Sequence, residues 1–169
     1  MGGPSVGHQL EGFVASVPVL TGAAAPIPGA RVRPLAAGLG LLPSSDAFFD
    51  HVTRGDASPV PPEFEAFSLL SQPLIDWATR LSREGPVAYV ETDFFGGVGT
   101  QAAVVWAGGR ILLSPLDSSH AWEDGRVVRH GTQGGAVNAA LRALGVVASP
   151  PKDEFEAVGL GDYRGTEDW

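Results

Sequence analysis

Residues 87–116 carry the pattern that most constrains the fold: three strand-like runs in succession, separated by glycine-containing turns. The runs cover residues 87–94, 100–107 and 110–116. Gly108 and Gly109 form a two-residue hairpin signal, because glycine adopts positive φ at little steric cost. The segment therefore predicts an antiparallel three-strand meander. Its apolar residues occupy both faces, which predicts a sheet covered on both sides or a covered face plus a partner surface.

Helical patterns flank the meander. Residues 72–83 and 135–144 place apolar side chains at i, i+3, i+4 and i+7, and proline or glycine marks their ends. Shorter signals predict helical turns at 19–25, after residue 46 and at 153–158. Short strands are predicted at 31–35 and 39–42, and a polar loop at 117–131. Residues 8–16 fit either a strand or a helix. We predict a single α+β domain over 1–169, with a mainly antiparallel sheet packed by two or more amphipathic helices and an acidic tail from about 150 to 169.

Composition narrows the classes of function. The chain has no cysteine, which excludes disulfides, thiolate catalysis and Cys-ligated metals and fits a cytoplasmic protein. It has no signal-peptide pattern and no long apolar run, so no membrane association is predicted. The net charge of −8 opposes nucleic-acid binding and favours a basic protein partner, although such a charge can also serve solubility alone.

Two acids stand directly before the glycine-rich stretch of the meander. Glu91 and Asp93 share one face of their strand, and paired carboxylates can hold a metal, act as acid and base, or meet Arg and Lys of a partner; a solvated or structural role is the alternative. The glycine-rich stretch, residues 96–100, lacks the lysine and the following helix that a phosphate loop needs. Its structural interpretation is a wide hairpin connection between two strands. The candidate binding residues are Glu91, Asp93, Phe95, Gly96, Gly97, Gly99, Gln101, Tyr163 and Trp169.

Catalytic signals are weaker. Glu91 and Asp93 could act with His120 or His130 in a small-molecule hydrolase, provided that these groups converge in one pocket. The histidines and acids match no compact metal-binding pattern such as H-E-x-x-H, and no G-x-S-x-G is present. We therefore predict no metal and no cofactor.

The chain also resembles a family of small uncharacterised bacterial cytosolic proteins. The segments that carry the resemblance are residues 88–101 (AYVETDFFGGVGTQ), 138–145 (NAALRALG), and the DEF, GLG and TEDW groups between 153 and 169. The resemblance implies no reaction, cofactor or catalytic residue. In its compact acidic form the chain is similar to immunity proteins that neutralise toxins, by type rather than by motif.

We expect, on these grounds, a protein-binding module that inhibits a basic partner in the manner of an immunity protein. Glu91, Asp93 and the acidic tail would face outward toward Arg and Lys of that partner, and exposed aromatic side chains would anchor the contact. The alternatives are the hydrolase described above and a structural component of a larger assembly. The sequence predicts no oligomeric state.

Overall fold

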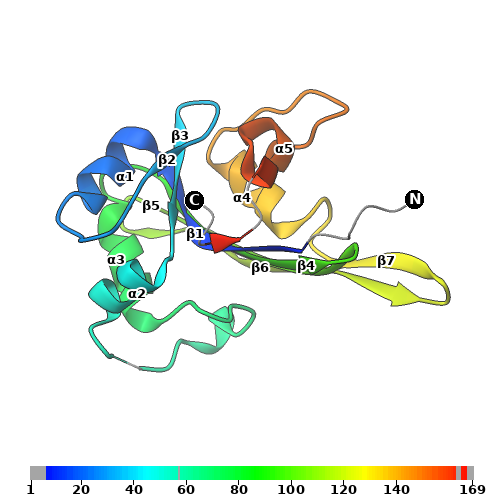
Figure 1. The fold of residues 1–169 in the computed structure, drawn as a ribbon, viewed down its shortest axis with the longest axis horizontal. Coiled ribbons are helices and arrows are strands. Elements are labelled where there is room, and N and C mark those ends of the chain that lie inside the picture. Colours follow the sequence, from blue (N-terminus) through cyan, green and yellow to red (C-terminus); the bar gives the residue numbers. More distant parts are fainter. Residues whose placement is uncertain (1–6, 57, 163–164, 167–169) are drawn as a thin grey trace.

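The computed structural model describes residues 7–56, 58–162 and 165–166 and shows an α+β fold built on one seven-stranded antiparallel sheet (Figure 1). The strand order is β2-β3-β1-β4-β5-β6-β7. The strands are β1 (His8–Ser16), β2 (Arg33–Pro34), β3 (Leu39–Pro43), β4 (Val87–Phe95), β5 (Val98–Ala107), β6 (Arg110–Glu123) and β7 (Arg126–Gly131). The predicted fold class is confirmed, and β4, β5 and β6 form the predicted meander.

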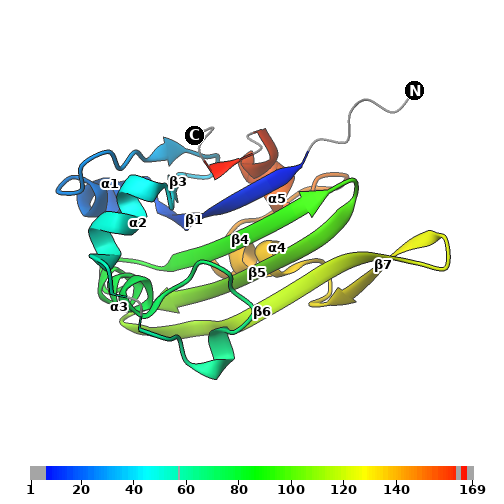
Figure 2. The ribbon, with the colours of Figure 1, turned by 60° about the horizontal axis from the view of Figure 1, so that its bottom comes forward.

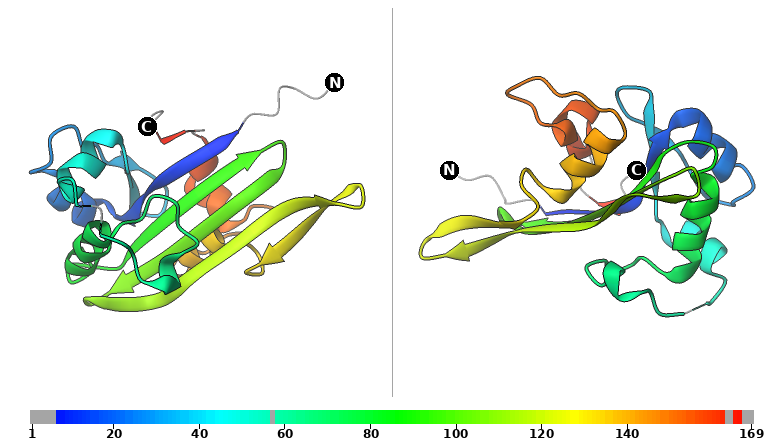
Figure 3. Two further views of the ribbon diagram at one scale, coloured as in Figure 1. Left: turned by 90° about the horizontal axis from the view of Figure 1, so that it is seen from below. Right: turned by 180° about the vertical axis from the view of Figure 1, so that it is seen from behind.

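Helices cover both faces of this sheet, as Figure 3 shows from two sides. They are α1 (Val17–Ala24), α2 (Asp46–Thr53), α3 (Gln72–Leu81), α4 (Ala136–Ala143) and α5 (Glu154–Val158), with the short 3-10 turns η1 (Pro62–Phe64) and η2 (Leu160–Asp162). We call the side covered by α1, α2, α3 and η1 the α3 face, and the side covered by α4, α5 and η2 the α4 face. Among the described residues, no helix is long and apolar enough to cross a membrane.

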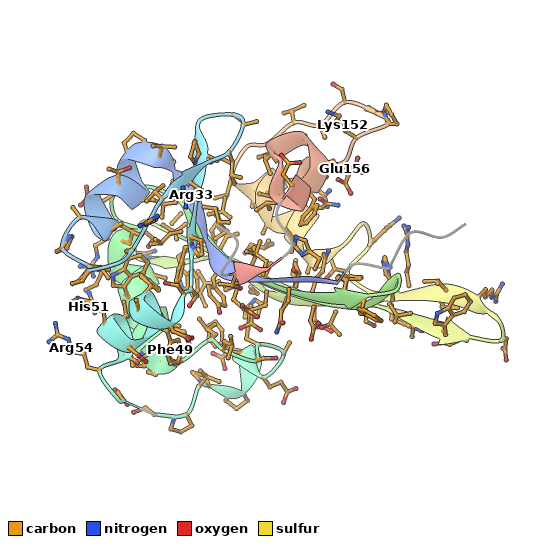
Figure 4. The ribbon with its side chains drawn as sticks, viewed as in Figure 1. Arg33, Phe49, His51, Arg54, Lys152 and Glu156 are labelled. Atoms are coloured by element: carbon orange, nitrogen blue, oxygen red, sulfur yellow. The ribbon has the colours of Figure 1, made fainter. Side chains whose placement is uncertain are left out.

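Each face has its own buried cluster. On the α3 face the ring of Phe13 lies 4.9 Å from the rings of Trp77 and Tyr89. On the α4 face Leu10 and Val14 pack with Leu141. Side chains fill the space between sheet and helices on both sides (Figure 4). The sheet is therefore covered on both faces, which agrees with the apolar residues on both faces of the meander.

Two segments differ from the sequence-based expectations. Residues 8–16 form β1, a central strand between β3 and β4. Residues 117–131, expected to be a polar loop, are instead the second half of β6 and all of β7. Asp124 and Gly125, with φ of 50° and 76°, make the tight turn between these strands. The resulting ribbon projects from the body of the molecule (Figure 2).

The glycine-rich stretch is a tight turn rather than a wide connection. Gly96 and Gly97 adopt φ of 63° and 84°, and Phe95 pairs with Val98 directly across the turn. Gly99 follows with φ of 154°, and a Cβ atom there would lie 2.0 Å from the Asp93 carbonyl oxygen. The three glycines therefore serve backbone geometry.

Candidate functional site

Glu91 does not face outward, so the expected orientation of this acid is wrong. Its side chain is only 7% exposed. Its carboxylate accepts the backbone N–H groups of Ser68, Leu69 and Leu70 at 2.6, 2.8 and 3.1 Å, and the hydroxyl of Tyr89 donates to it at 3.0 Å. The loop between η1 and α3 passes over β4 and uses this carboxylate as its acceptor. Glu91 therefore fastens that loop to the sheet.

Tyr89 belongs to the same arrangement. Burial raises the pKa of the Tyr89 hydroxyl well above its usual value of 10.0, and the negative charge of Glu91 raises it further. The phenol consequently keeps its proton and remains a hydrogen-bond donor to Glu91.

A second buried acid, Glu11, lies directly opposite Glu91 on β1. Its side chain is 8% exposed, the Thr166 hydroxyl donates to its carboxylate, and its own backbone N–H donates to Thr166 Oγ1 at 3.1 Å. Burial raises the pKa of Glu11 above its ordinary value of 4.5; the nearby Glu91 and Asp93 also raise it, while the Thr166 bond lowers it. Sequence reasoning missed Glu11, although an acid two residues before the buried Phe13 on an apolar strand was a usable signal.

The chain after residue 150 docks on its own sheet where it is described. Gly165 forms a parallel bridge with Gln9, and Thr166 bonds Glu11 as above. Tyr163 and Trp169, the predicted binding aromatics of this segment, lie outside the described residues.

Asp93 and Phe95 follow Glu91 on the same face of β4, and both are exposed. Asp93, Glu11 and Glu91 contribute to a pocket of about 250 Å³ that we call the acidic pocket. Leu69, 43% exposed, forms part of its rim, and Phe95, 67% exposed, lies two residues beyond Asp93. The lining residues are Gln9, Glu11, Ala66, Ser68, Leu69, Glu91, Thr92, Asp93, Thr100 and Ala102.

No basic side chain of the described residues pairs with these acids. The two salt bridges recorded there join His130 to Glu123 and Arg142 to Glu154. Nor does the described part of the chain contain three or more His, Asp or Glu side chains placed to hold a metal ion. Hydrogen bonds stabilise Glu11 and Glu91, but no described cation forms an ion pair with the acids of the acidic pocket.

The remaining predicted residues lie elsewhere. Gln101 lines the α4 face, where its Oε1 accepts the Val137 N–H at 3.2 Å. His120 shares that face and meets the ring of Phe94 edge-on at 5.3 Å. His130 bonds Glu123 at 2.5 Å and lies on β7, three strands from β4. Neighbouring strands are about 4.8 Å apart, so His130 is roughly 14 Å from Asp93 across the sheet. The acids and histidines of the hydrolase hypothesis do not converge.

Replacing Glu11 with glutamine should stabilise the protein increasingly as pH rises. Because folding raises the pKa of this acid, the folded state holds the proton more tightly than the unfolded state. The stability that this proton gives is fully present below pH 4.5, the ordinary pKa, and is lost as pH rises through the folded pKa. Glutamine removes that loss.

Urea unfolding of Glu11→Gln and the parent at about pH 4 and pH 7 measures this difference. A stability difference that stays constant with pH would contradict the raised pKa of the buried Glu11 carboxyl.

The chain was compared with protein-family models, curated proteins and solved structures, and no match was found in any of the three comparisons.

Proposed function

We propose that this chain is a protein-binding module that receives a basic side chain of its partner in the acidic pocket. The observation that carries this proposal is the buried carboxyl of Glu11, held beside Glu91 and Asp93 with no described cation near it. Buried like charges raise the free energy of the unbound protein. An Arg or Lys head group entering the pocket would relieve that cost and would be attracted at short range.

The surroundings of the pocket support a protein rather than a small molecule as the ligand. Interfaces combine apolar anchors with polar groups at their rim, and Leu69 and Phe95 supply exposed apolar side chains beside the acids. The volume of about 250 Å³ is below the range of about 300–1,000 Å³ that is usual for small-molecule sites. It suits the end of one long side chain. Of the two basic residues, arginine fits better because its planar fork can bond separate carboxylates.

The proposed role is that of a cytoplasmic, immunity-like inhibitor, which covers a basic surface of its partner. The net charge of −8 accelerates association with such a surface and makes that association sensitive to salt. Of the residues predicted for docking, the proposal keeps Asp93 and Phe95 as partner contacts and adds Glu11 and Leu69. Glu91 contributes charge to the pocket, but its own hydrogen bonds hold the loop.

The acidic pocket can be tested with a short capped peptide that contains one arginine. Addition of this peptide to the ¹⁵N-labelled protein should shift the backbone amide signals of Glu11, Asp93 and Thr100. The same peptide with citrulline, which is neutral and nearly isosteric, should leave them unchanged because the charge is missing. Asp93→Asn should weaken binding by about fivefold or more, since it removes the most exposed acid of the pocket.

Glu84→Gln provides the matched control, because it removes one negative charge from an exposed position after α3 and outside the pocket. It should change binding by less than about twofold at physiological salt, where distant surface charges are screened. Equal binding of the arginine and citrulline peptides, or equal weakening by Asp93→Asn and Glu84→Gln, would reject the proposal.

A further inference from the structure

A second pocket, on the opposite face of the sheet, is built differently from the acidic pocket. It has a volume of about 400 Å³ and lies on the α4 face, between strands β5 to β7 and the loop that leads into α4. Its lining includes Gln101, Ser118, His120, Arg129, Gly134 and Asp153. We call it the donor pocket, because several hydrogen-bond donors line it.

Strand register gathers its polar side chains. Gln101 pairs with Ser118 across β5 and β6, and His120 pairs with Arg129 across β6 and β7. Residues two apart on a strand point to the same side, so all four side chains stand on the α4 face. Three neighbouring strands thus present an amide, a hydroxyl, an imidazole and a guanidinium to one pocket.

The start of α4 uses the acceptor atoms of two of these side chains. Ser118 Oγ accepts the Ala136 N–H at 3.0 Å, and Gln101 Oε1 accepts the Val137 N–H at 3.2 Å. This leaves the hydroxyl hydrogen of Ser118 and the amide hydrogens of Gln101 as donors. Among the described residues no hydrogen bond from either donor is recorded, although Ser118 is only 7% exposed. Because both groups line the pocket, these donors are available to an acceptor atom that enters it.

Arg129 adds a full positive charge. Neither of the two salt bridges recorded in the described part of the chain involves it. One acid, Asp153, also lines the pocket, and each of its oxygens already accepts one hydrogen bond. Its Oδ1 accepts the Glu156 N–H at 2.9 Å, and its Oδ2 accepts an amide hydrogen of Asn138 at 3.1 Å. Hydrogen-bond donors of Gln101, Ser118 and Arg129 therefore remain to meet a ligand.

We propose that the donor pocket binds a small anionic molecule through its carboxylate or phosphate group. Arg129 supplies the charge, the Gln101 amide and the Ser118 hydroxyl supply directional hydrogen bonds, and His120 can donate from a ring nitrogen. The volume of about 400 Å³ falls within the usual range for small-molecule ligands. The site does not depend on the acidic pocket, because the two lie on opposite faces of the sheet.

Titration of the ¹⁵N-labelled protein with sodium phosphate and, separately, with sodium acetate tests the site and distinguishes the two anion classes. Sodium chloride at equal ionic strength is the blank. The bound anion should shift the Gln101 side-chain amide and the backbone amides of Ser118 and Gly134. The anion that saturates at the lower concentration identifies the ligand group.

Arg129→Gln should weaken this binding by about tenfold or more, because it removes the charged donor. Arg126→Gln is the matched control: it makes the same change on the same exposed strand, but on the other face and outside the pocket. It should weaken binding by less than about twofold. Shifts that chloride reproduces, or equal losses in the two variants, would overturn the proposal.

Discussion

Replacing Glu91 with alanine should lower the free energy of unfolding by about 4 kcal/mol, as measured by urea denaturation near neutral pH. The carboxylate accepts three backbone N–H groups and the Tyr89 hydroxyl. Alanine leaves the two buried donors, the Leu70 N–H and the Tyr89 hydroxyl, without an acceptor, and each unsatisfied buried donor costs about 1–3 kcal/mol before the structure relaxes. The N–H groups of Ser68 and Leu69 are only partly buried and add less. The amides of Ser68, Leu69 and Leu70 should also lose protection against hydrogen exchange.

Asp93→Ala is the control for this substitution, since Asp93 lies two residues further on the same face of β4 but is exposed. It should change stability by about 0.5 kcal/mol or less. If the two alanine variants lost equal stability, or if the loop amides kept their protection in Glu91→Ala, Glu91 would not be the anchor of the loop.

Gly99→Ala should have the second largest effect, a loss of about 3 kcal/mol or more. At this position φ is 154°, and an added Cβ would lie 2.0 Å from the Asp93 carbonyl oxygen and 2.7 Å from the Phe94 Cα. Both of these atoms belong to the backbone, so the β4–β5 pairing has to shift to make room. Because Asp93 stands in that pairing, the arginine peptide should also bind more weakly.

Gly97→Ala separates backbone strain from this collision. Gly97 also has positive φ, at 84°, but nothing lies within 4 Å of the added Cβ. The expected cost is only the strain of the left-handed conformation, about 1–2 kcal/mol. Thermal or urea unfolding of both variants measures the difference, and equal losses would show that the close approach at Gly99 is tolerated.

The local signals in the sequence predicted the regular elements well. Helices are present within the predicted ranges 72–83 and 135–144, as α3 (Gln72–Leu81) and α4 (Ala136–Ala143), because a continuous apolar stripe needs one face of a helix. The sequence pattern of residues 117–131 predicts a loop where the structure has strands. Both faces of β7 are largely exposed, so its sequence shows no alternation of apolar and polar residues. The Asp124-Gly125 pair was the remaining signal for that hairpin.

The candidate site was predicted only in part, because its decisive contacts are distant in sequence. Glu91 is held by amides 21 to 23 residues earlier, and Glu11 meets Glu91 through the pairing of β1 with β4. The position of Gln101 depended on turn length. With a turn of two residues, Gln101 pairs with Thr92, which puts it on the face opposite to Glu91 and Asp93.

The bond between Glu11 and Thr166 has a consequence for biosynthesis. Glu11 is translated early, yet the hydroxyl that caps its carboxyl arrives more than 150 residues later on the nascent chain. Until residue 166 has been synthesised and has docked on β1, the Glu11 carboxyl lacks this hydrogen-bond donor.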